Sequence, residues 1–394
     1  MRAVTWQGRE DVRVEDVPDP TIEEPTDAVV EITSTAICGS DLHLYGPLAP
    51  FMEPGDVLGH EPMGRVVAVG DDVSHVAVGD RVVIPFNISC GSCYMCDRTL
   101  FAQCETTQNR DQGTGASLFG YTKLYGHVPG GQAELLRVPQ AHFGPIKVPE
   151  GPPDDRFLFL SDVLPTAWQA VAYADVPGDG SLAVIGLGPI GQMAARIARQ
   201  QGVEHVYGVD LVPERLAMAE RHGIETVDLR STDDVADALR ALSGGRGPDG
   251  VIDAVGLEAH GAPVASAMQR AAGLLPKAVS EPLAKKAGID RLTALRTAIA
   301  AVRRGGTLSV VGVYGGAFDP LPMFELFDKG VQIRMGQAHV KRWVPEILPL
   351  LEKDEDVLGL DDFTTHRLPL DDAPRAYAMF QAKQDGAIKV VLQP

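Results

Sequence analysis

The stretch Ser181-Leu-Ala-Val-Ile-Gly-Leu-Gly-Pro-Ile-Gly191 decides the fold of this chain. Its first five residues form an apolar run typical of a buried strand, and residues 192–201, which follow it, have helical propensity with apolar spacing. The three glycines between strand and helix form the pattern G-x-G-x-x-G in the context that it requires. The first permits a tight turn, the second lets a pyrophosphate approach the backbone, and the third lets the helix pack on the strand. The stretch therefore predicts a dinucleotide-binding unit.

A carboxylate follows at the distance that such a unit requires. The strand-like run 205–209 ends at Asp210, 19 residues beyond Gly191. A carboxylate there can accept hydrogen bonds from the adenosine ribose and repel the 2′-phosphate of NADP, so NAD is the predicted cofactor. The candidate cofactor-binding residues are Gly186, Gly188, Pro189, Ile190, Gly191, Asp210, Arg215, Val313 and Tyr314. For Val313 and Tyr314, which end a later strand-like run, ordinary strand-end packing is an equal alternative.

The rest of the chain extends this pattern in both directions. Strand-like runs at 250–256 and 306–314 continue a doubly wound parallel sheet, and the helix-rich stretch 257–304 between them is longer than a crossover needs, which indicates an insertion. The first ~150 residues alternate short apolar runs with turns, which favours a β-rich, barrel-like domain. We expect an α/β protein with domains at 1–155, 156–335 and a return segment at 336–394.

Charge and hydropathy exclude several classes of partner. The 394-residue chain carries a formal net charge of −18, and such a field repels nucleic-acid phosphates and anionic lipid. Its apolar runs stay below the ~18 residues that suggest a membrane-spanning helix. The N-terminus lacks the charged and apolar regions of a signal peptide. We therefore expect a soluble, cytoplasmic protein with no nucleic-acid or membrane partner.

Four of the five cysteines lie together. Cys90, Cys93, Cys96 and Cys104 have the spacing C-x2-C-x2-C-x7-C, within a loop-like lobe at 88–106. Disulfides are rare in a reducing compartment, and an iron–sulfur run that closes with C-x3-C-P is not matched, because seven residues precede the last cysteine and Glu105 follows it. Thiolates in this spacing converge on tetrahedral zinc, and four of them leave no vacancy for substrate. The lobe is therefore predicted to hold a structural zinc ion.

A second metal site is predicted from the remaining cysteine. Cys38 offers a thiolate and His60 a neutral imidazole, both common zinc ligands, and a catalytic zinc needs a third protein ligand and an open position. Asp162 is the best candidate for that ligand, because it is a carboxylate in an otherwise apolar stretch, where an unpaired charge would be costly. A helix N-cap before Pro165 is the alternative role for Asp162.

Four polar residues near these ligands are further candidates. Ser40 and His43 follow Cys38 closely enough to pass a proton outward from the site. Asp41 is placed to orient a ligating imidazole. Glu61 is placed to hydrogen-bond nearby or to approach the metal transiently.

The chain resembles the zinc-dependent alcohol dehydrogenases of the medium-chain dehydrogenase/reductase superfamily over nearly its full length. The resemblance is carried, in the family's order, by Cys38-Gly-Ser-Asp-x-His43, Gly59-His60-Glu61, the four-cysteine lobe, and the glycine motif with Asp210. Within the family it looks most like the glutathione-independent formaldehyde dehydrogenase group. That branch is favoured by Ser161-Asp162-x-Leu-Pro-Thr166, by the long insertion and by Gly336-Gln337.

The resemblance implies a GroES-like β-barrel catalytic domain joined to a Rossmann domain, with two zinc ions per chain. Zinc held by Cys38, His60 and Asp162 would act as a Lewis acid, and Ser40 and His43 would carry the proton while hydride passes between a small alcohol or aldehyde hydrate and NAD. A homodimer or homotetramer is the default assembly. The alternatives are a formaldehyde dismutase or dehydrogenase with tightly held NAD, a metal-free reductase, and a catalytically silent NAD-binding protein.

Overall fold

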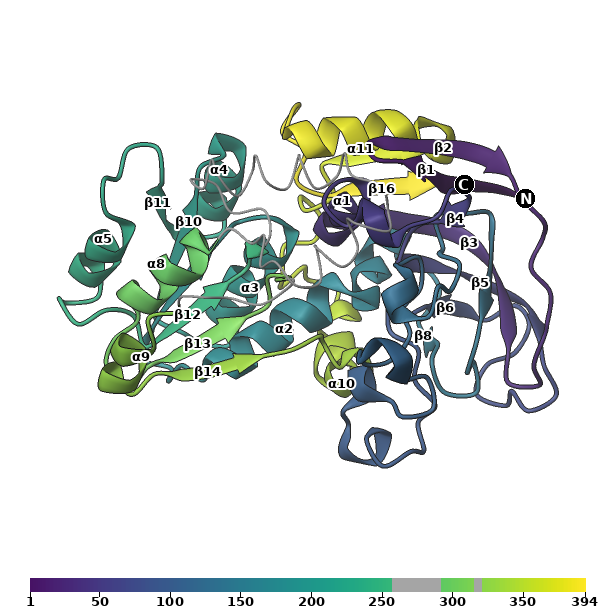
Figure 1. The fold of residues 1–394 in the computed structure, drawn as a ribbon, viewed down its shortest axis with the longest axis horizontal. Helices are drawn as coiled ribbons and strands as arrows, with labels where there is room; N and C mark the ends of the chain where they lie inside the picture. Colours follow the sequence, from purple (N-terminus) through teal and green to yellow (C-terminus); the bar gives the residue numbers. More distant parts are fainter. Residues whose placement is uncertain (257–291, 315–320) are drawn as a thin grey trace. The chain divides into compact units, whose positions relative to one another are not determined.

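A computed structural model describes residues 1–256, 292–314 and 321–394 in two compact units (Figure 1). Unit 1 contains Met1–Pro165 and Ala338–Pro394, and unit 2 contains Thr166–Gln337. Most of the expected insertion at 257–304 lies outside the described residues, and its described end, from residue 292, carries helix α8 (Thr293–Ala301).

Unit 2 is built on a six-stranded parallel sheet with the strand order β11-β10-β9-β12-β13-β14. The strands are β9 (Ser181–Ile185), β10 (His205–Asp210), β11 (Glu225–Asp228), β12 (Gly250–Asp253), β13 (Thr307–Val310) and β14 (Gln332–Met335). Its central strands β9, β12 and β13 are buried along their whole length, as expected when helices cover both faces of a parallel sheet. The order reverses between β9 and β12, the kind of position at which open α/β sheets bind ligands. The predicted doubly wound sheet is confirmed.

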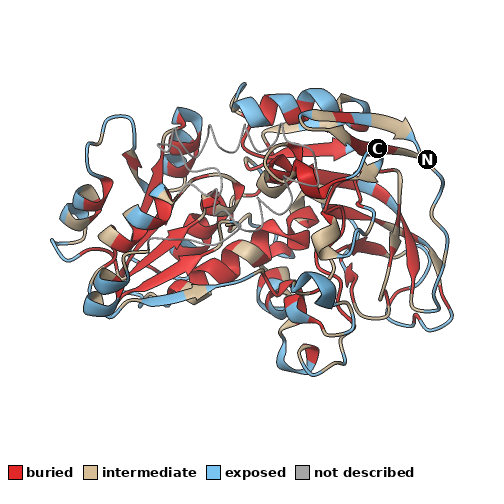
Figure 2. Cartoon of the chain, viewed as in Figure 1, coloured by how far each residue is buried: buried red, intermediate tan, exposed pale blue. Residues whose placement is uncertain are grey.

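The helices of unit 2 present exposed residues on their outer sides. They are α3 (Pro189–Gln200), α4 (Pro213–Arg221), α5 (Val235–Leu242), α8 and α9 (Met323–Lys329), and α2 (Val163–Ala174) begins in unit 1 and continues into unit 2. Figure 2 shows the central strands β9, β12 and β13 in the buried class and exposed residues along α5 and α9. Among the described residues, no helix has the length and apolar character needed to cross a bilayer.

Unit 1 is β-rich, as predicted. One sheet has the order β15-β16-β3-β5-β6-β8 with β7 also pairing with β3, and a smaller sheet has the order β2-β1-β4. The strands are β1 (Arg2–Gly8), β2 (Asp11–Asp16), β3 (Ala28–Ile37), β4 (Asp56–Val57), β5 (Glu61–Val69), β6 (Arg81–Val83), β7 (Leu135–Val138), β8 (Ile146–Lys147), β15 (His366–Pro369) and β16 (Val390–Gln393). Apolar residues that alternate along β3, β5 and β6 form one core with Phe119. The chain end joins this sheet, because Val391 of β16 pairs with Ala36 of β3.

Short helices connect the strands of unit 1. The α-helices are α1 (Gly39–Tyr45), α10 (Val340–Leu351) and α11 (Ala373–Ala382). The 3-10 turns are η1 (Ala49–Phe51), η2 (Cys96–Arg98), η3 (Phe101–Gln103), η4 (Arg110–Gln112), η5 (Lys123–Tyr125), η6 (Asp154–Arg156), η7 (Leu158–Ser161) and η9 (Leu370–Asp372). The cysteine lobe has no long element of its own, and its small core consists of cysteines packed with Phe101 and Ala116.

The start of α10 is fastened to the part of unit 1 that carries the cysteine lobe. Asn87 Nδ2 donates to the carbonyl oxygen of Ala338 (2.7 Å), and the amide of Ala102 donates to His339 Nδ1 (3.1 Å). His339 is buried, and burial together with the charge of Arg342 lowers its pKa to about 4. The neutral imidazole is therefore the form that this attachment requires.

This attachment predicts a pH dependence of stability. The pKa of His339 is lower in the folded chain than its ordinary value of 6.5, so the unfolded chain binds the proton first. The neutral His339 therefore contributes to the free energy of unfolding above pH 6.5, and this contribution is lost as the pH falls toward 4. The control is His339→Asn, which keeps a hydrogen-bond acceptor but does not titrate. Between pH 6.5 and 4, the free energy of unfolding should fall in both proteins, and the fall should be larger in the wild type by on the order of 2 kcal/mol. Urea denaturation at several pH values measures the difference, and parallel curves would contradict it.

Candidate functional site

The four clustered cysteines of unit 1 bring their sulfurs together. The Sγ atoms of Cys90 and Cys96 are 4.0 Å apart, and those of Cys93 and Cys104 are 3.9 Å apart. All four lie within 4.8 Å of one another. Four thiolates around a tetrahedral zinc ion, each about 2.3 Å from it, have sulfur–sulfur distances of about 3.8 Å. The cluster therefore fits a closed tetrahedral metal site.

Hydrogen-bond donors in this cluster favour the thiolates of Cys90 and Cys93, whereas burial and the neighbouring Cys93 raise the pKa of Cys96. The hydroxyl of Thr106 donates to Cys90 Sγ (3.1 Å), and the amide of Glu105 donates to Cys93 Sγ (3.3 Å). Burial opposes ionisation of Cys90, but the bond from Thr106 and neighbouring amides outweigh it and lower the pKa of Cys90 to about 6. A thiolate is the form that ligates zinc.

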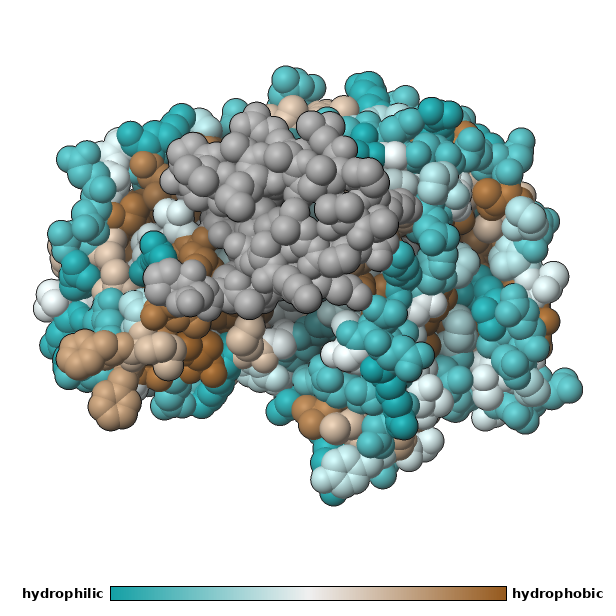
Figure 3. All heavy atoms as spheres, viewed as in Figure 1, coloured by the Kyte–Doolittle hydropathy of each residue, from teal (hydrophilic) through white to brown (hydrophobic). Residues whose placement is uncertain are grey.

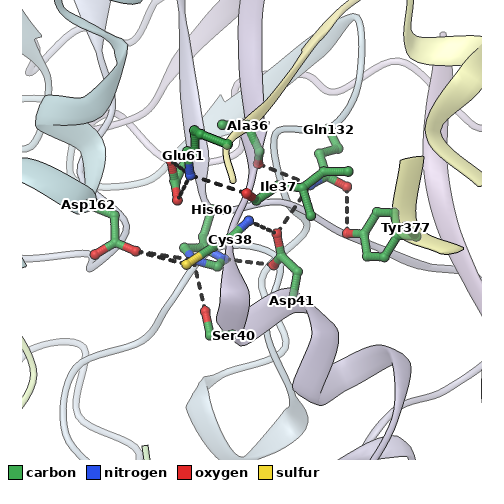
Figure 4. A network of polar contacts seen from close by, with 11 residues as sticks. Ala36, Ile37, Cys38, Ser40, Asp41, His60, Glu61, Gln132, Asp162 and Tyr377 are labelled. Atoms are coloured by element: carbon green, nitrogen blue, oxygen red, sulfur yellow. Dashed lines mark hydrogen bonds and ion pairs between the residues drawn. The ribbon is translucent and has the colours of Figure 1, made fainter. Parts of the chain in front are cut away.

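A second cluster in unit 1 joins residues from three distant segments. Asp162 Oδ2 lies 3.5 Å from Cys38 Sγ and 3.5 Å from His60 Nε2. All three residues are buried, and Figure 4 shows their side chains converging. Distances of 3.5 Å match the edges, about 3.3–3.8 Å, of a tetrahedral site with sulfur, nitrogen and oxygen ligands. The residues thus fit a zinc ion with three protein ligands and one open position.

Sheet register explains why Cys38 and His60 meet. Cys38 follows the last residue of β3 and His60 precedes the first residue of β5, and these strands pair with Ala36 opposite Glu61. Asp162 arrives on the turn between η7 and α2, where the amide of Phe86 donates to the carbonyl of Ser161 (3.0 Å). Asp162 directly precedes Val163, the first residue of α2, and its carboxylate faces the cluster.

Asp41 fixes the ring of His60. Its Oδ1 lies 2.9 Å from His60 Nδ1, so that Nε2 faces Cys38 and Asp162. Burial disfavours the imidazolium, but the charges of Asp41 and Asp162 outweigh it and raise the pKa of His60 well above its usual value. The orienting role predicted for Asp41 agrees with this geometry.

The cluster is a buried environment with an excess of negative charge. Burial, together with the carboxylates of Asp162 and Glu61, raises the pKa of the Cys38 thiol to about 11. A buried carboxylate is costly unless a cation or hydrogen bonds compensate it. A dication among Cys38, His60 and Asp162 would supply that compensation.

Glu61 is held by a lysine that the sequence analysis did not single out. Its carboxylate lies within 4.8 Å of the other potential ligand atoms, yet Lys389 Nζ contacts both oxygens, at 2.7 and 2.6 Å. Lys389 also donates to the carbonyl oxygen of Ile37 (3.2 Å), and neither charged side chain is exposed to solvent. The signal was present in the sequence, because Lys389 interrupts the apolar run 388–392, just as Asp162 interrupts another.

The two relay candidates lie on α1. Ser40 Oγ is 3.2 Å from His60 Nε2, at the edge of the cluster. His43 follows one helical turn later and is 6% exposed, which leaves little contact with solvent. The structure thus brings Ser40 to the metal ligands and places His43 on the same helix.

The glycine turn of unit 2 has the strain that only glycine tolerates. Gly186 has φ +90°, and a Cβ there would approach Val255 Cγ2 to 2.7 Å. A Cβ on Gly191 would lie 1.8 Å from the carbonyl oxygen of Gly186. Gly188 is the N-cap of α3, and Pro189 and Ile190 form its first turn. The motif therefore adopts the close-packed strand–turn–helix that it predicted.

Asp210 is fastened to this turn. Its carboxylate accepts hydrogen bonds from the amides of Leu187 (2.7 Å), Leu211 (2.7 Å) and Val212 (2.9 Å), and Arg215 Nη1 lies 3.6 Å away. Each carboxylate oxygen has two acceptor positions, so the group can still accept a ribose hydroxyl. Asp210 and Arg215 thus both lie beside the glycine turn.

Val313 and Tyr314 lie where β13 has ended, near the carboxyl end of β12. Tyr314 Oη donates to Asp253 Oδ2 (2.5 Å), and Asp253 is buried at the end of β12. Val313 is 41% exposed, and a Cβ on Gly256 would lie 2.5 Å from its amide. The tyrosine hydroxyl is therefore engaged by Asp253, a partner that no local sequence signal indicated.

Two protein-family models match the chain. The alcohol dehydrogenase GroES-like domain matches residues 24–150, and the zinc-binding dehydrogenase model matches residues 189–275. The first match covers Cys38, His60 and the cysteine lobe, and the second includes Asp210.

Full-length relatives agree with these matches. An uncharacterised zinc-type alcohol dehydrogenase-like protein of Bacillus subtilis is 40% identical over 100% of both chains. A formaldehyde dismutase of Pseudomonas putida is 31% identical over 100% of this chain and 97% of its own, in agreement with the expected formaldehyde dehydrogenase-like relationship. Among solved structures, an alcohol dehydrogenase from a Thermus species superimposes with a TM-score of 0.81, at 34% identity over 100% of this chain and 99% of its own.

The buried pair of Glu61 and Lys389 predicts a large, partner-dependent effect on stability. Lys389→Met leaves a carboxylate buried without its cation and should lower the free energy of unfolding by about 3 kcal/mol. In the double variant Glu61→Met/Lys389→Met no charge is left over, so most of that loss should be recovered. Urea denaturation of the four proteins in the cycle measures this.

The matched control is the exposed pair of Arg65 and Glu150, whose closest atoms are 2.7 Å apart, against 2.6 Å in the buried pair. Arg65→Met should lower the free energy of unfolding far less than Lys389→Met does, because solvent screens that pair. Equal losses for Lys389→Met and Arg65→Met would contradict the interpretation of the buried pair.

Proposed function

The chain belongs to the zinc-type alcohol dehydrogenases of the medium-chain dehydrogenase/reductase superfamily, and on that basis we propose that it transfers a hydride between a small alcohol, or an aldehyde hydrate, and NAD. The observation that carries the proposal is the convergence of Cys38, His60 and Asp162 at distances of 3.5 Å. Three ligands leave an open position of the kind that catalytic zinc sites use.

The residues around the open position have complementary roles in this proposal. A zinc ion bound there supplies Lewis acidity that lowers the pKa of an alcohol hydroxyl. One thiolate and one carboxylate bring two negative charges, which balance a dication, while Asp41 holds the imidazole of His60. Lys389 keeps the carboxylate of Glu61 engaged beside the ligands.

We assign the movement of the proton to Ser40 and His43. Ser40 presents its hydroxyl at the cluster, 3.2 Å from His60 Nε2. A hydroxyl both accepts and donates, so it can take a proton on one side and release one on the other. His43 lies one turn further along α1 and has the side chain whose ordinary pKa is nearest to neutral pH.

The preference for NAD rests on Asp210. Its carboxylate is fixed at the glycine turn by three backbone amides, so it cannot easily turn away from a bound dinucleotide. A fixed negative charge there repels the 2′-phosphate of NADP. Arg215 lies 3.6 Å from that carboxylate and partly offsets its charge, but the three amide bonds keep the carboxylate in place.

Formaldehyde chemistry is a second candidate. Relatives named formaldehyde dismutase and glutathione-independent formaldehyde dehydrogenase match 100% and 97% of this chain, at 31% and 32% identity. In that case the substrate would be formaldehyde hydrate, and NAD would stay bound between turnovers.

Cysteine chemistry supports a cytoplasmic location as part of the proposal. All five cysteines are free of disulfides, and four of them are arranged as metal ligands. Zinc thiolate sites of this kind suit a reducing compartment.

NAD reduction across a panel of alcohols, polyols, threonine and formaldehyde tests the proposed activity. The wild type should contain two zinc ions per chain and should turn over at least one small substrate, with NAD preferred to NADP. Cys38→Ser should retain one zinc ion and lose at least about 100-fold in kcat/KM, because the Lewis acid is lost.

The matched control replaces a cysteine in the other cluster. Cys96→Ser should also lose one zinc ion, but its damage should appear as lower stability of the lobe. Unchanged turnover in Cys38→Ser would refute the zinc mechanism. A wild type that binds NAD and zinc but oxidises nothing in the panel would favour the catalytically silent alternative.

We also propose that the chain forms a homo-oligomer through the surface of α9 and β14. Large apolar side chains are exposed on both elements: Met323 (63%), Phe324 (84%), Phe327 (87%), Ile333 (44%) and Met335 (62%). Figure 3 shows apolar residues gathered over α9. β14 is an edge strand of the sheet, and an exposed apolar edge favours pairing with another chain. A second copy related by a two-fold axis would cover the same surface on both chains.

Sedimentation of a variant with this surface made polar tests the assembly. Phe324→Ser/Phe327→Ser should shift the wild-type oligomer to a smaller species at the same concentration, because apolar burial drives association. Val78→Ser, which changes an apolar residue that is 64% exposed in unit 1, should leave the assembly unchanged. A monomeric wild type, or an unshifted double variant, would contradict the proposed surface.

A further inference from the structure

Gln132 connects the carboxylate behind the metal-site histidine to a distant tyrosine. Its Nε2 donates to Asp41 Oδ2 (3.3 Å) and to the carbonyl oxygen of Ala36 (3.2 Å). Its Oε1 accepts a hydrogen bond from Tyr377 Oη (2.8 Å). Figure 4 shows this chain of contacts running from Tyr377 through Gln132 and Asp41 to His60.

The orientation of the amide is determined by its partners. A carboxylate and a carbonyl oxygen can only accept, so the NH2 group must face Asp41 and Ala36, and the amide oxygen must face Tyr377. The tyrosine hydroxyl is then the donor. Burial, followed by the charge of Asp41, raises the pKa of Tyr377 well above its ordinary value, so the hydroxyl keeps its proton.

Gln132 also packs against the backbone that carries the histidine. The amide of Gln132 donates to the carbonyl of Leu58 (2.9 Å), and that of Gly131 donates to the carbonyl of Gly59 (2.8 Å). Gly59 has φ +97°, and a Cβ there would lie 2.4 Å from Gln132 Cγ. The segment therefore holds His60 twice, through the backbone directly before it and through Asp41 behind its ring.

Tyr377 anchors this arrangement from the return segment. It lies on α11, is fully buried, and its ring centre is 5.5 Å from that of Tyr45 on α1, the helix that carries Asp41. One side chain thus contacts both Gln132 and the helix of Asp41. Asp41 has its own fixed geometry, since its Oδ2 also accepts from the amide of Cys38 (3.0 Å).

We propose that Gln132 and Tyr377 are positioning residues for the histidine ligand of the candidate catalytic metal. They fix the carboxylate of Asp41, and Asp41 fixes the ring of His60 so that Nε2 faces Cys38 and Asp162. The inference rests on the proposed metal site, but not on which substrate the chain oxidises.

Removal of the two links in turn, with metal release as the readout, tests this role. Tyr377→Phe keeps the ring and its packing but leaves Gln132 Oε1 without its buried donor. Gln132→Leu removes the donor to Asp41. Outer partners of metal-ligating histidines commonly contribute 10- to 100-fold to metal affinity, so we expect release to a chelator to accelerate about 10-fold in Gln132→Leu and about 3-fold in Tyr377→Phe.

The phase of release that belongs to this site is identified with Cys38→Ser, which lacks it. A second readout is the visible spectrum after Co²⁺ has replaced the metal in the same site: both variants should shift the ligand-field bands, because the geometry of the imidazole changes.

The matched control is Tyr207→Phe in unit 2, which also removes a buried tyrosine hydroxyl, one that donates to the carbonyl of Leu242 (2.8 Å). It should lower the overall stability but leave metal release and the Co²⁺ spectrum unchanged. Wild-type release and spectra in both Gln132→Leu and Tyr377→Phe, or an equal acceleration in Tyr207→Phe, would overturn the inference. These readouts need no turnover, so a wild type that holds zinc but oxidises no alcohol would refute the proposed activity and leave this inference standing.

Discussion

The buried negative charge around His60 is the constraint on which the metal-site region of unit 1 depends. Asp41, Asp162 and Glu61 are all buried near Cys38 and His60. Burial of carboxylates is tolerated when each has a cation or a set of donors. Lys389 forms an ion pair with Glu61, and Asp41 accepts hydrogen bonds from the amide of Cys38 and from Gln132. The cluster that includes Asp162 has the geometry of a site for a dication. The register of β3 with β5 and the return of the chain end on β16 bring these groups together.

The two units contribute different parts of the chemistry. Unit 1 contains both clusters of candidate metal ligands, and a strand from the end of the chain completes its sheet. The proposed positioning residues Gln132 and Tyr377, which contact each other, are more than 240 positions apart in sequence. Unit 2 contains the glycine turn, where packing of backbone on backbone leaves no room for a Cβ, and the carboxylate of Asp210 fastened to it. The metal cluster serves the reacting oxygen and the glycine turn serves the dinucleotide, which is the division of labour proposed for this chain.

Local sequence patterns predicted the parts of the site that are local in the chain. Each of these parts is contained in about a dozen residues: the glycine turn with the strand before it, and the four spaced cysteines. The steric limits of a tight turn and the spacing of metal ligands both act between residues that are close in sequence. Asp162 was found by another route, as a charge in an apolar stretch. The same argument applies to Lys389, which shows that the signal was available. Gln132 and Tyr377 gave no such signal, because neither residue type is unusual at its position in the sequence. Their connection to His60 through Asp41 exists only in the tertiary structure.

The central claim is that Cys38, His60 and Asp162 together hold a metal ion. A crystal structure of the protein, with anomalous differences measured at the zinc absorption edge, tests it most directly. We expect two peaks per chain, one surrounded by the four clustered cysteines and one about 2.0–2.3 Å from Cys38 Sγ, His60 Nε2 and a carboxylate oxygen of Asp162. A single peak at the cysteine lobe, or a second peak with Asp162 turned away from it, would contradict the account.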